Sequence, residues 1–410
     1  MSIYPVHFWF LIIVEALMAA GYAVSFPFLA VYLTSQKSIS MTFVGFYLSF
    51  SMFLSSLANF YGGELSDKFG RKKIMFFSLF GRSLIVFLIA IVIKYDMYIF
   101  LLFILHPIGL FFGSFFNPSA RAYVADLIEA KKRLNAYSIM RIGTNSGWAI
   151  GPAIGGMVAL KSYANMFFIT AAIYFICSVL LFFLLKEIGF KSNKGKNKFS
   201  FSLDLKIMKQ LYRDKVYLYL CIFTFTIAMV MSQLVVPVSM YSKKYLFFNE
   251  HQIGLLFTLN GLMVVFLQYF VSNFLSRYPI NFSVAIGAFL YAVGYLMFGF
   301  SVFYSMAILS IIVVTFGELS LSPGIQTMAA NIAPENKKGR YIGAHTMIQQ
   351  AGNSAGIFIG SFLMDNLSIY LKQISWFCMF LIGMISFYGF LKFPKVIEGG
   401  EIEEAEKNLI

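Results

Sequence analysis

Residues 62–73 read GGELSDKFGRKK, a short charged segment between two long apolar runs. Within it, Asp67 and Arg71 carry opposite charges, and Gly70 between them permits a tight turn. Ion pairs in a loop between two membrane helices can hold the helix pair against a neighbour and release it when the protein changes conformation. The segment therefore predicts two membrane helices joined by a charged turn that acts as a latch.

The composition of the whole chain is that of an integral membrane protein. Of its 410 residues, 59% are hydrophobic and 12% are charged, whereas a soluble protein of this size carries about 25% charged residues. The net charge of +14 does not indicate a nucleic-acid partner, because the basic residues gather in a few loops. The three cysteines lie in apolar runs, so we expect neither disulfides nor a metal site.

Twelve segments are long and apolar enough to span a membrane, which takes about 20 residues in a helix. The first half supplies residues 8–33, 42–62, 74–93, 97–116, 135–160 and 163–185. The second half supplies residues 216–241, 252–275, 280–302, 303–328, 341–367 and 375–391. We therefore expect an all-α integral membrane protein with twelve transmembrane helices.

The basic residues lie mostly in alternate loops. One set of loops holds Lys68, Arg71, Lys72, Lys73, Arg121, Lys131, Lys132, Arg133, Arg277, Lys337, Lys338 and Arg340, besides nine basic residues in 186–215. The other set holds Lys37, Lys94, Lys161, Lys243, Lys244 and Lys372. Because Lys and Arg are in excess in cytoplasmic loops, the pattern predicts a multi-pass protein of the plasma or inner membrane with both termini cytoplasmic, its basic loops beside anionic lipids.

The two halves of the chain repeat one another. Residues 44–50 (VGFYLSF) match residues 253–259 (IGLLFTL), and Pro118 matches Pro323. An internal repeat of six helices is typical of transporters. We expect an N-terminal six-helix bundle at 1–185, a basic cytoplasmic linker at 186–215, a C-terminal six-helix bundle at 216–392 and an acidic cytoplasmic tail at 393–410. An amphipathic helix is predicted near 203–213, and disorder in the tail.

Few ionisable residues fall inside the predicted spans, and each is a candidate functional residue because a charge in the membrane is costly. The candidates for proton and substrate coupling are Glu15, Glu318, His106, Arg82 and Arg141. A buried carboxyl group can alternate between a proton and a cationic substrate and so couple the two. The alternatives are a protonated acid in a structural hydrogen bond, an ion pair or snorkelling for the arginines, and packing for the histidine.

The segment 135–160 carries a row of small residues. Gly143, Gly147, Gly151 and Gly155 recur every four residues and share one helix face, where a neighbouring helix can approach closely. Pro152 removes a backbone hydrogen bond and favours a bend, and Gly156 extends the small surface. Ordinary close packing is the alternative to a functional role.

The charged turn resembles the loop between helices 2 and 3 of the major facilitator superfamily, whose pattern is G-x-L-(A/S)-D-(R/K)-x-G-R-(R/K). The resemblance begins at Gly63 and ends at Lys72. It implies two six-helix bundles that expose a central cavity alternately to each side of the membrane. It also implies a cytoplasmic gate formed by Gly63, Asp67, Gly70, Arg71, Asp126 and Arg340.

The glycine row resembles the helix 5 signature of the superfamily's drug and cation antiporters, G-x-x-x-G-P-x-x-G-G, at residues 147–156. By the same resemblance, Glu15 is similar to the helix 1 acid of some multidrug antiporters, and Glu318 to the helix 10 acid of related exporters. One position departs from the family pattern: His106 stands where helix 4 usually carries an arginine.

These patterns together predict a secondary transporter that exports amphipathic or cationic small molecules in exchange for protons, as a 12-helix multidrug antiporter does. A nutrient symporter or a specialised metabolite or lipid exporter is the alternative, and a membrane receptor or scaffold is a more remote one. We expect no enzyme activity and no ATP site, because the G-x-x-x-x-G-K-(S/T) loop is absent from the sequence. We expect a monomer that needs no cofactor beyond the proton gradient and has a small-molecule substrate, protons and membrane lipids as partners.

Overall fold

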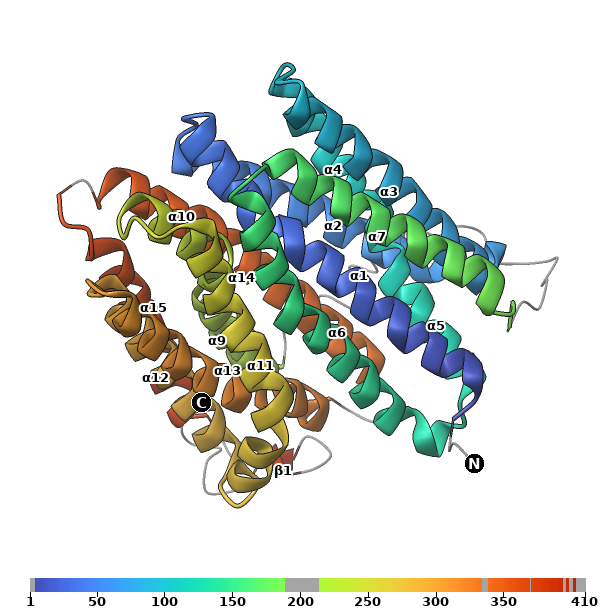
Figure 1. Cartoon of the computed structure of the whole chain (residues 1–410). Helices are drawn as coiled ribbons and strands as arrows, with labels where there is room; N and C mark the ends of the chain where they lie inside the picture. Colours follow the sequence, from blue (N-terminus) through green and yellow to red (C-terminus); the bar gives the residue numbers. More distant parts are fainter. Residues whose placement is uncertain are drawn as a thin grey trace. The chain divides into compact units, whose positions relative to one another are not determined.

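A computed structural model describes residues 4–188, 214–333, 338–368, 370–393, 396–397 and 401–402. Every one of the twelve predicted spans corresponds to helix in this part of the chain (Figure 1). The predicted amphipathic helix near 203–213 lies outside the described residues.

The first half of the chain is helical almost throughout. Its elements are α1 (Val6–Val31), η1 (Tyr32–Gln36), α2 (Met41–Phe69), α3 (Arg71–Lys94), α4 (Phe100–Ser114), α5 (Phe116–Leu127), α6 (Ala130–Ala159) and α7 (Tyr163–Leu184). The π-helical η1 continues α1, and α4 with α5 makes one membrane-length unit broken only at Phe115.

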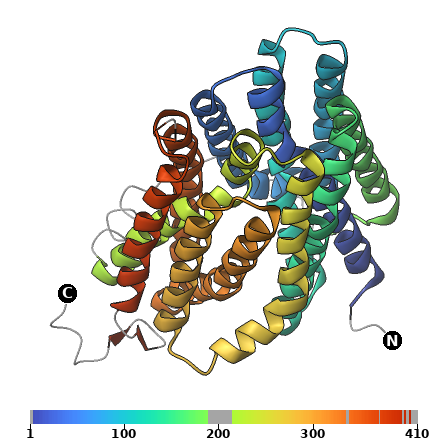
Figure 2. The same ribbon diagram turned by 60° about the vertical axis from the view of Figure 1, so that its left-hand side comes forward.

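The described part of the second half follows the same plan. Its elements are α9 (Lys215–Met231), η2 (Ser232–Leu234), α10 (Val236–Lys244), α11 (Glu250–Leu275), α12 (Ile280–Gly299), α13 (Tyr304–Ile332), α14 (Lys338–Asn366) and α15 (Ile374–Leu391). The helices α12 and α13 form an antiparallel hairpin, orange in Figure 2, and α15 packs against α12.

Local sequence signals fix several helix starts. Ser40, Ser162 and Asp214 precede α2, α7 and α9, and each side chain accepts a hydrogen bond from a backbone N–H in the first turn of its helix. Such N-caps satisfy donors that the helix itself leaves unpaired. The turn between α2 and α3 is made by Gly70 alone, whose φ of 103° is favoured only for glycine.

Ten of the described helical segments are long and apolar enough to cross a membrane. The membrane-length helices α6 and α14 lie outside this set, because their sequences are more polar. Phe, Leu, Ile and Tyr side chains are widely exposed on the helices, as expected for surfaces that face lipid.

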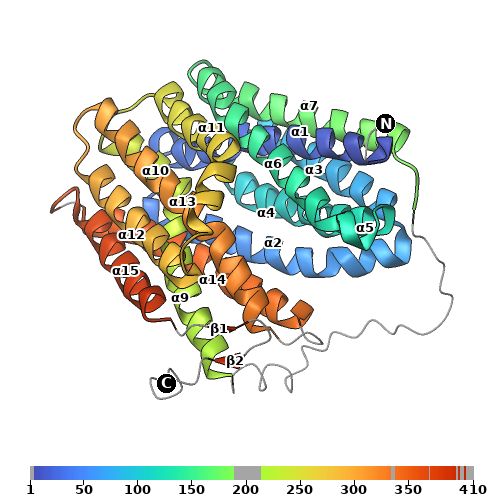
Figure 3. The same cartoon turned by 90° about the horizontal axis from the view of Figure 1, so that it is seen from below.

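The chain divides into two compact units. The first comprises residues 1–193 and 238–265, and the second comprises residues 194–237 and 266–410. In the first unit, α1 runs alongside α6 and α7, and α3 packs against α4 and α7 (Figure 3).

The acidic tail does not conform fully to the predicted disorder. Val396–Ile397 (β1) and Glu401–Ile402 (β2) pair as a two-stranded antiparallel ladder.

Candidate functional site

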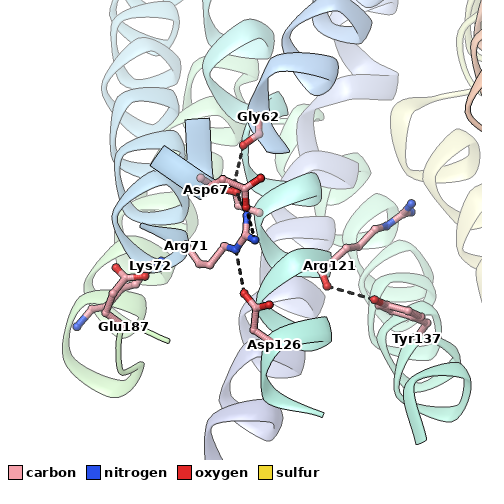
Figure 4. A network of polar contacts seen from close by, with 10 residues as sticks. Gly62, Asp67, Arg71, Lys72, Arg121, Asp126, Tyr137 and Glu187 are labelled. Atoms are coloured by element: carbon pink, nitrogen blue, oxygen red, sulfur yellow. Dashed lines mark hydrogen bonds and ion pairs between the residues drawn. The ribbon is translucent and has the colours of Figure 1, made fainter. Parts of the chain in front are cut away.

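Arg71 is the centre of the charged turn. Its guanidinium forms an ion pair with Asp67 one turn earlier, donates from Nη1 to Ser66 Oγ at 2.6 Å, and donates from Nε to Asp126 Oδ2 at 3.1 Å (Figure 4). Asp126 lies on α5, so one arginine joins the α2–α3 turn to a third helix. The Arg71 side chain is 14% exposed and that of Asp126 is 31% exposed, which shields their attraction from full solvent screening.

Two contacts beside the charged turn, one at the start of α3 and one at Gly62 on α2, were not indicated by the sequence. Glu187 Oε1 accepts a hydrogen bond from the backbone N–H of Lys72 at 3.1 Å, in the first turn of α3. A carboxylate at this position interacts favourably with the N-terminal end of the helix dipole. A Cβ atom added to Gly62 would lie 2.6 Å from Pro118 Cγ, so this glycine permits close contact between α2 and α5.

Two further residues of the predicted gate are placed only in part. Gly63 lies inside α2, one residue after Gly62. Arg340 lies in the first turn of α14, and its side chain falls outside the described ones. The gate interactions of the described residues are therefore those of Asp67, Arg71 and Asp126.

Glu15 is a buried acid in the middle part of α1. It is 4% exposed, and its Oε2 has no hydrogen-bond partner among the described residues. The charge of Arg121 on α5 acts on it electrostatically, but the two side chains form no ion pair within 4.0 Å. A carboxylate buried in this way is unstable unless a proton or a cationic group neutralises it.

Arg82 and His106, from α3 and α4, line one cavity in the first unit. The Arg82 guanidinium lies over two aromatic rings, 5.1 Å from the centroid of Tyr22 and 4.7 Å from that of Tyr174. An ion pair, one of the alternatives left open for Arg82, is not found among the described residues. His106 is 8% exposed, and its Nδ1 has no described hydrogen-bond partner.

The other candidates lie apart from this cavity. Arg141 is half-buried in α6 and forms no ion pair with a described residue. Glu318 is half-buried in α13 of the second unit, where its charge acts on the phenol groups of Tyr291 and Tyr295. Of the five predicted coupling residues, Arg82 and His106 line this cavity together.

The glycine row of α6 faces the backbone of α1. A Cβ atom at Gly151 would lie 2.6 Å from the Ala20 carbonyl oxygen, and one at Gly147 or Gly155 would collide with the carbonyl oxygens of Ala16 and Val24 respectively. A Cβ atom at Gly143 would lie 3.0 Å from Ile12 Cγ2 and 3.4 Å from the Ile12 carbonyl oxygen. The close helix approach predicted from the spacing is present in the structure.

The sixth residue of this motif contacts a different helix. A Cβ atom at Gly156 would collide with the Glu250 carbonyl oxygen at the start of α11, and the Pro152 carbonyl oxygen lies against Gly254. Nearby, Thr258 Oγ1 accepts a hydrogen bond from the Ala153 backbone N–H at 3.1 Å. The motif therefore packs against α1 and against the part of α11 that belongs to the first unit.

One buried ion pair was missed in the sequence. Glu250 Oε1 accepts from Lys243 Nζ at 2.7 Å and from the Tyr163 hydroxyl at 2.7 Å. The Glu250 side chain is 7% exposed, so its charge depends on these two donors. The available signal was an acid two residues before the apolar span predicted at 252–275, but its partners lie on α10 and α7.

The sequence model of one protein family matches almost the whole chain. The model described as "Major Facilitator Superfamily" matches residues 11–356 and, in an overlapping second match, residues 234–407. The chain belongs to the Major Facilitator Superfamily. It is a secondary transporter of this superfamily and a multi-pass membrane protein, not an enzyme.

Several bacterial members of the superfamily are similar over most of the chain. The uncharacterized MFS-type transporter YqjV of Bacillus subtilis (strain 168) is 27% identical, covering 89% of this chain and 87% of the relative. The Na(+), Li(+), K(+)/H(+) antiporter of Planococcus maritimus is 24% identical, with coverages of 81% and 84%. The multidrug resistance protein MdtH of Proteus mirabilis (strain HI4320) is 22% identical, with coverages of 93% and 92%.

The fold agrees with this membership. A crystal structure of the nucleoside transporter NupG superposes with a TM-score of 0.80 at 14% identity, covering 94% of this chain and 99% of that one. At this identity the similarity concerns the fold alone.

Proposed function

We propose that the chain exports amphipathic or cationic small molecules in exchange for protons, by alternating access. The two halves of the chain act as six-helix bundles, at 1–185 and 216–392. The protein lies in a plasma or inner membrane, and the loops rich in Lys and Arg, together with the linker 186–215, face the cytoplasm. The transporter works as a monomer.

The single observation that carries the proposal is Glu15. Glu15 is 4% exposed, its Oε2 lacks a described partner, and Arg121, whose charge acts on it, forms no direct ion pair with it. A carboxylate in this place needs a proton or a positively charged ligand, and the two cannot be held together. Mutually exclusive binding of a proton and a cation is the minimum chemistry of an antiporter.

Two further observations support antiport. The α6 glycines that resemble the antiporter signature pack on α1, the helix that carries Glu15, so a shift of α6 would be transmitted to the acid. Two similar proteins are named a multidrug resistance protein and a cation/proton antiporter. Arg71, with Asp67 and Asp126, supplies a conformational latch.

The proposal is tested with purified protein in liposomes that contain a pH-sensitive dye and are more acidic inside than outside. A panel of lipophilic cations, sugars, peptides and lysolipids is added outside. We expect lipophilic cations to accelerate the loss of internal protons, because each cation that enters exchanges for a proton that leaves.

The matched variants are Glu15→Gln and Glu129→Gln. Glu129 is a control because its side chain is 79% exposed and its described partner is Lys132, at 3.6 Å. Glu15→Gln should abolish cation-driven proton release, while Glu129→Gln retains it. Release at the wild-type rate in Glu15→Gln would remove Glu15 as the coupling acid.

The alternative, a nutrient symporter, predicts the opposite proton movement. With the acidic side outside, a symported sugar or peptide would carry protons inward and acidify the liposome. Inward proton movement with a sugar or peptide, combined with silence for all lipophilic cations, would overturn the antiport proposal.

A further inference from the structure

Arg82 is a positive charge deep inside a membrane helix. It lies about 17 Å along α3 from the first residue of the helix, at 1.5 Å per residue. Its side chain is half-buried, and it forms no hydrogen bond or ion pair with a described residue. Intramembrane charges are normally paired, so the protein leaves this cation in need of a counter-charge.

The aromatic rings around Arg82 supply only part of that charge balance. Tyr22 and Tyr174 lie on the guanidinium at 5.1 and 4.7 Å, close enough for cation–π attraction. Such contacts leave the five N–H donors of arginine without acceptors. The attraction of two rings is also weaker than the cost of moving a cation out of water.

The cavity beside Arg82 presents further hydrogen-bond donors and no acid. Its lining includes Tyr22, Ser25, His106 and Tyr174, and no Asp or Glu is among its lining residues. The Tyr174 hydroxyl and His106 Nδ1 are buried and have no described hydrogen-bond partner. The Thr170 hydroxyl, by contrast, donates to the Gly21 and Met166 carbonyl oxygens, so it is already satisfied.

The backbone is shaped to hold the guanidinium at this place. A Cβ atom at Gly113 would lie 2.5 Å from both Cδ and Nη1 of Arg82. The absence of that side chain on α4 therefore makes the room that Arg82 occupies. Any side chain at residue 113 would push the guanidinium away from the cavity.

The cavity is small. Its volume is about 30 Å³, enough for about two water-sized particles. It is too small for a drug-sized molecule, whose site measures at least about 300 Å³. A monatomic anion fits this volume and the donor set, whereas a divalent oxyanion such as sulfate exceeds both the volume and the single positive charge.

We propose that the cavity binds a small monovalent anion of halide size, held by the Arg82 guanidinium and the hydroxyl groups of Ser25, Tyr22 and Tyr174. The anion is the counter-ion of Arg82 and connects α1, α3 and α7 inside the first unit. The site is separate from the proposed proton exchange at Glu15, which does not line the cavity. Its test requires binding measurements and no transport.

The first experiment measures the ³⁵Cl NMR linewidth of chloride in a solution of the purified wild-type protein in detergent. We expect line broadening above that of a detergent blank, and bromide should remove it by competition, while sulfate at equal ionic strength should not. Chloride added to protein in gluconate should also raise the melting temperature in a saturable way. The absence of excess broadening in the wild-type protein would overturn the proposal.

The second experiment compares variants. Arg82→Gln should lose the broadening and the chloride-dependent rise in melting temperature, whereas Arg277→Gln, the same change at an exposed arginine outside the cavity, should keep both. Ser25→Ala removes one donor with little change in shape and should weaken the chloride affinity several-fold, which keeps the test open if Arg82→Gln does not fold. Undiminished chloride binding in Arg82→Gln, or stabilisation by carboxylates but not by chloride, would refute a halide site.

Discussion

The contact between α1 and α6 makes a quantitative prediction about Gly151. In Gly151→Ala, the new methyl group would lie 2.6 Å from the Ala20 carbonyl oxygen and 2.8 Å from Ala23 Cβ. A carbon and a carbonyl oxygen in contact normally stay at least about 3.3 Å apart, so the helices must separate by roughly 0.7 Å. Overpacking of this kind costs about 1–3 kcal/mol.

The helix propensity of alanine opposes this cost. Replacing glycine by alanine inside a helix stabilises it by about 0.8–1 kcal/mol. The expected net loss in free energy of unfolding is therefore about 0–2 kcal/mol. Gly143→Ala should cost less than Gly151→Ala, because the contacts of its methyl group, Ile12 Cγ2 at 3.0 Å and the Ile12 carbonyl oxygen at 3.4 Å, are less close.

The control is Gly343→Ala in α14, where an added Cβ atom meets nothing within 4 Å. This variant has the higher helix propensity of alanine without a steric clash, so its free energy of unfolding should equal or exceed that of the wild type. The free energies are measured by equilibrium denaturation in mixed micelles, followed by circular dichroism. If Gly151→Ala is as stable as Gly343→Ala, the close contact between α1 and α6 is wrong.

Two other predictions concern the charged turn. Asp126→Asn should lower the free energy of unfolding by about 0.5–1 kcal/mol. Asp67→Asn should lower it less, because Asp67 is 64% exposed and solvent screens its ion pair with Arg71. If thermal unfolding shows Asp67→Asn to be the more destabilising change, the less exposed Arg71–Asp126 pair is not the stronger one. Gly70→Ala should cost about 1–3 kcal/mol, because a φ of 103° is strained for alanine and the methyl group would lie 2.7 Å from Glu187 Oε2. Adding Glu187→Ala should recover only the part due to that collision, and full recovery in the same assay would show that the backbone at residue 70 is unstrained.

Local patterns of the sequence predicted the helices and the small-residue contact. Length and hydropathy located a helix at each of the twelve predicted spans, because the membrane imposes one minimum length on every helix. The four-residue spacing from Gly143 to Gly155 predicted one closely packed face, because it follows the helical period. The turn at Gly70 and its two charges were predicted for the same reason, since all the deciding residues are adjacent in the chain.

The meeting of distant side chains was not predictable. The helices α3 and α4 are apolar on every face, so the sequence does not indicate which faces turn toward one another, and the shared cavity of Arg82 and His106 was not foreseen. Of the alternatives left open for Arg82, an ion pair is not found among the described residues, and Tyr22 and Tyr174 lie beside its guanidinium. Glu250 was missed because Lys243 and Tyr163 approach it from two other helices.

The polar character of α6 and α14 has a consequence for how the protein enters the bilayer during synthesis. A helix of low hydropathy partitions poorly into lipid by itself and is retained by a partner that is already there. Gly147, Gly151 and Gly155 of α6 contact the backbone of α1, and Gly352 of α14 contacts the Phe225 carbonyl oxygen of α9. The helices α1 and α9, against which α6 and α14 pack, are the first membrane helices of their halves. Because the ribosome delivers α1 before α6 and α9 before α14, each weakly inserting helix meets a membrane in which its docking surface is already present.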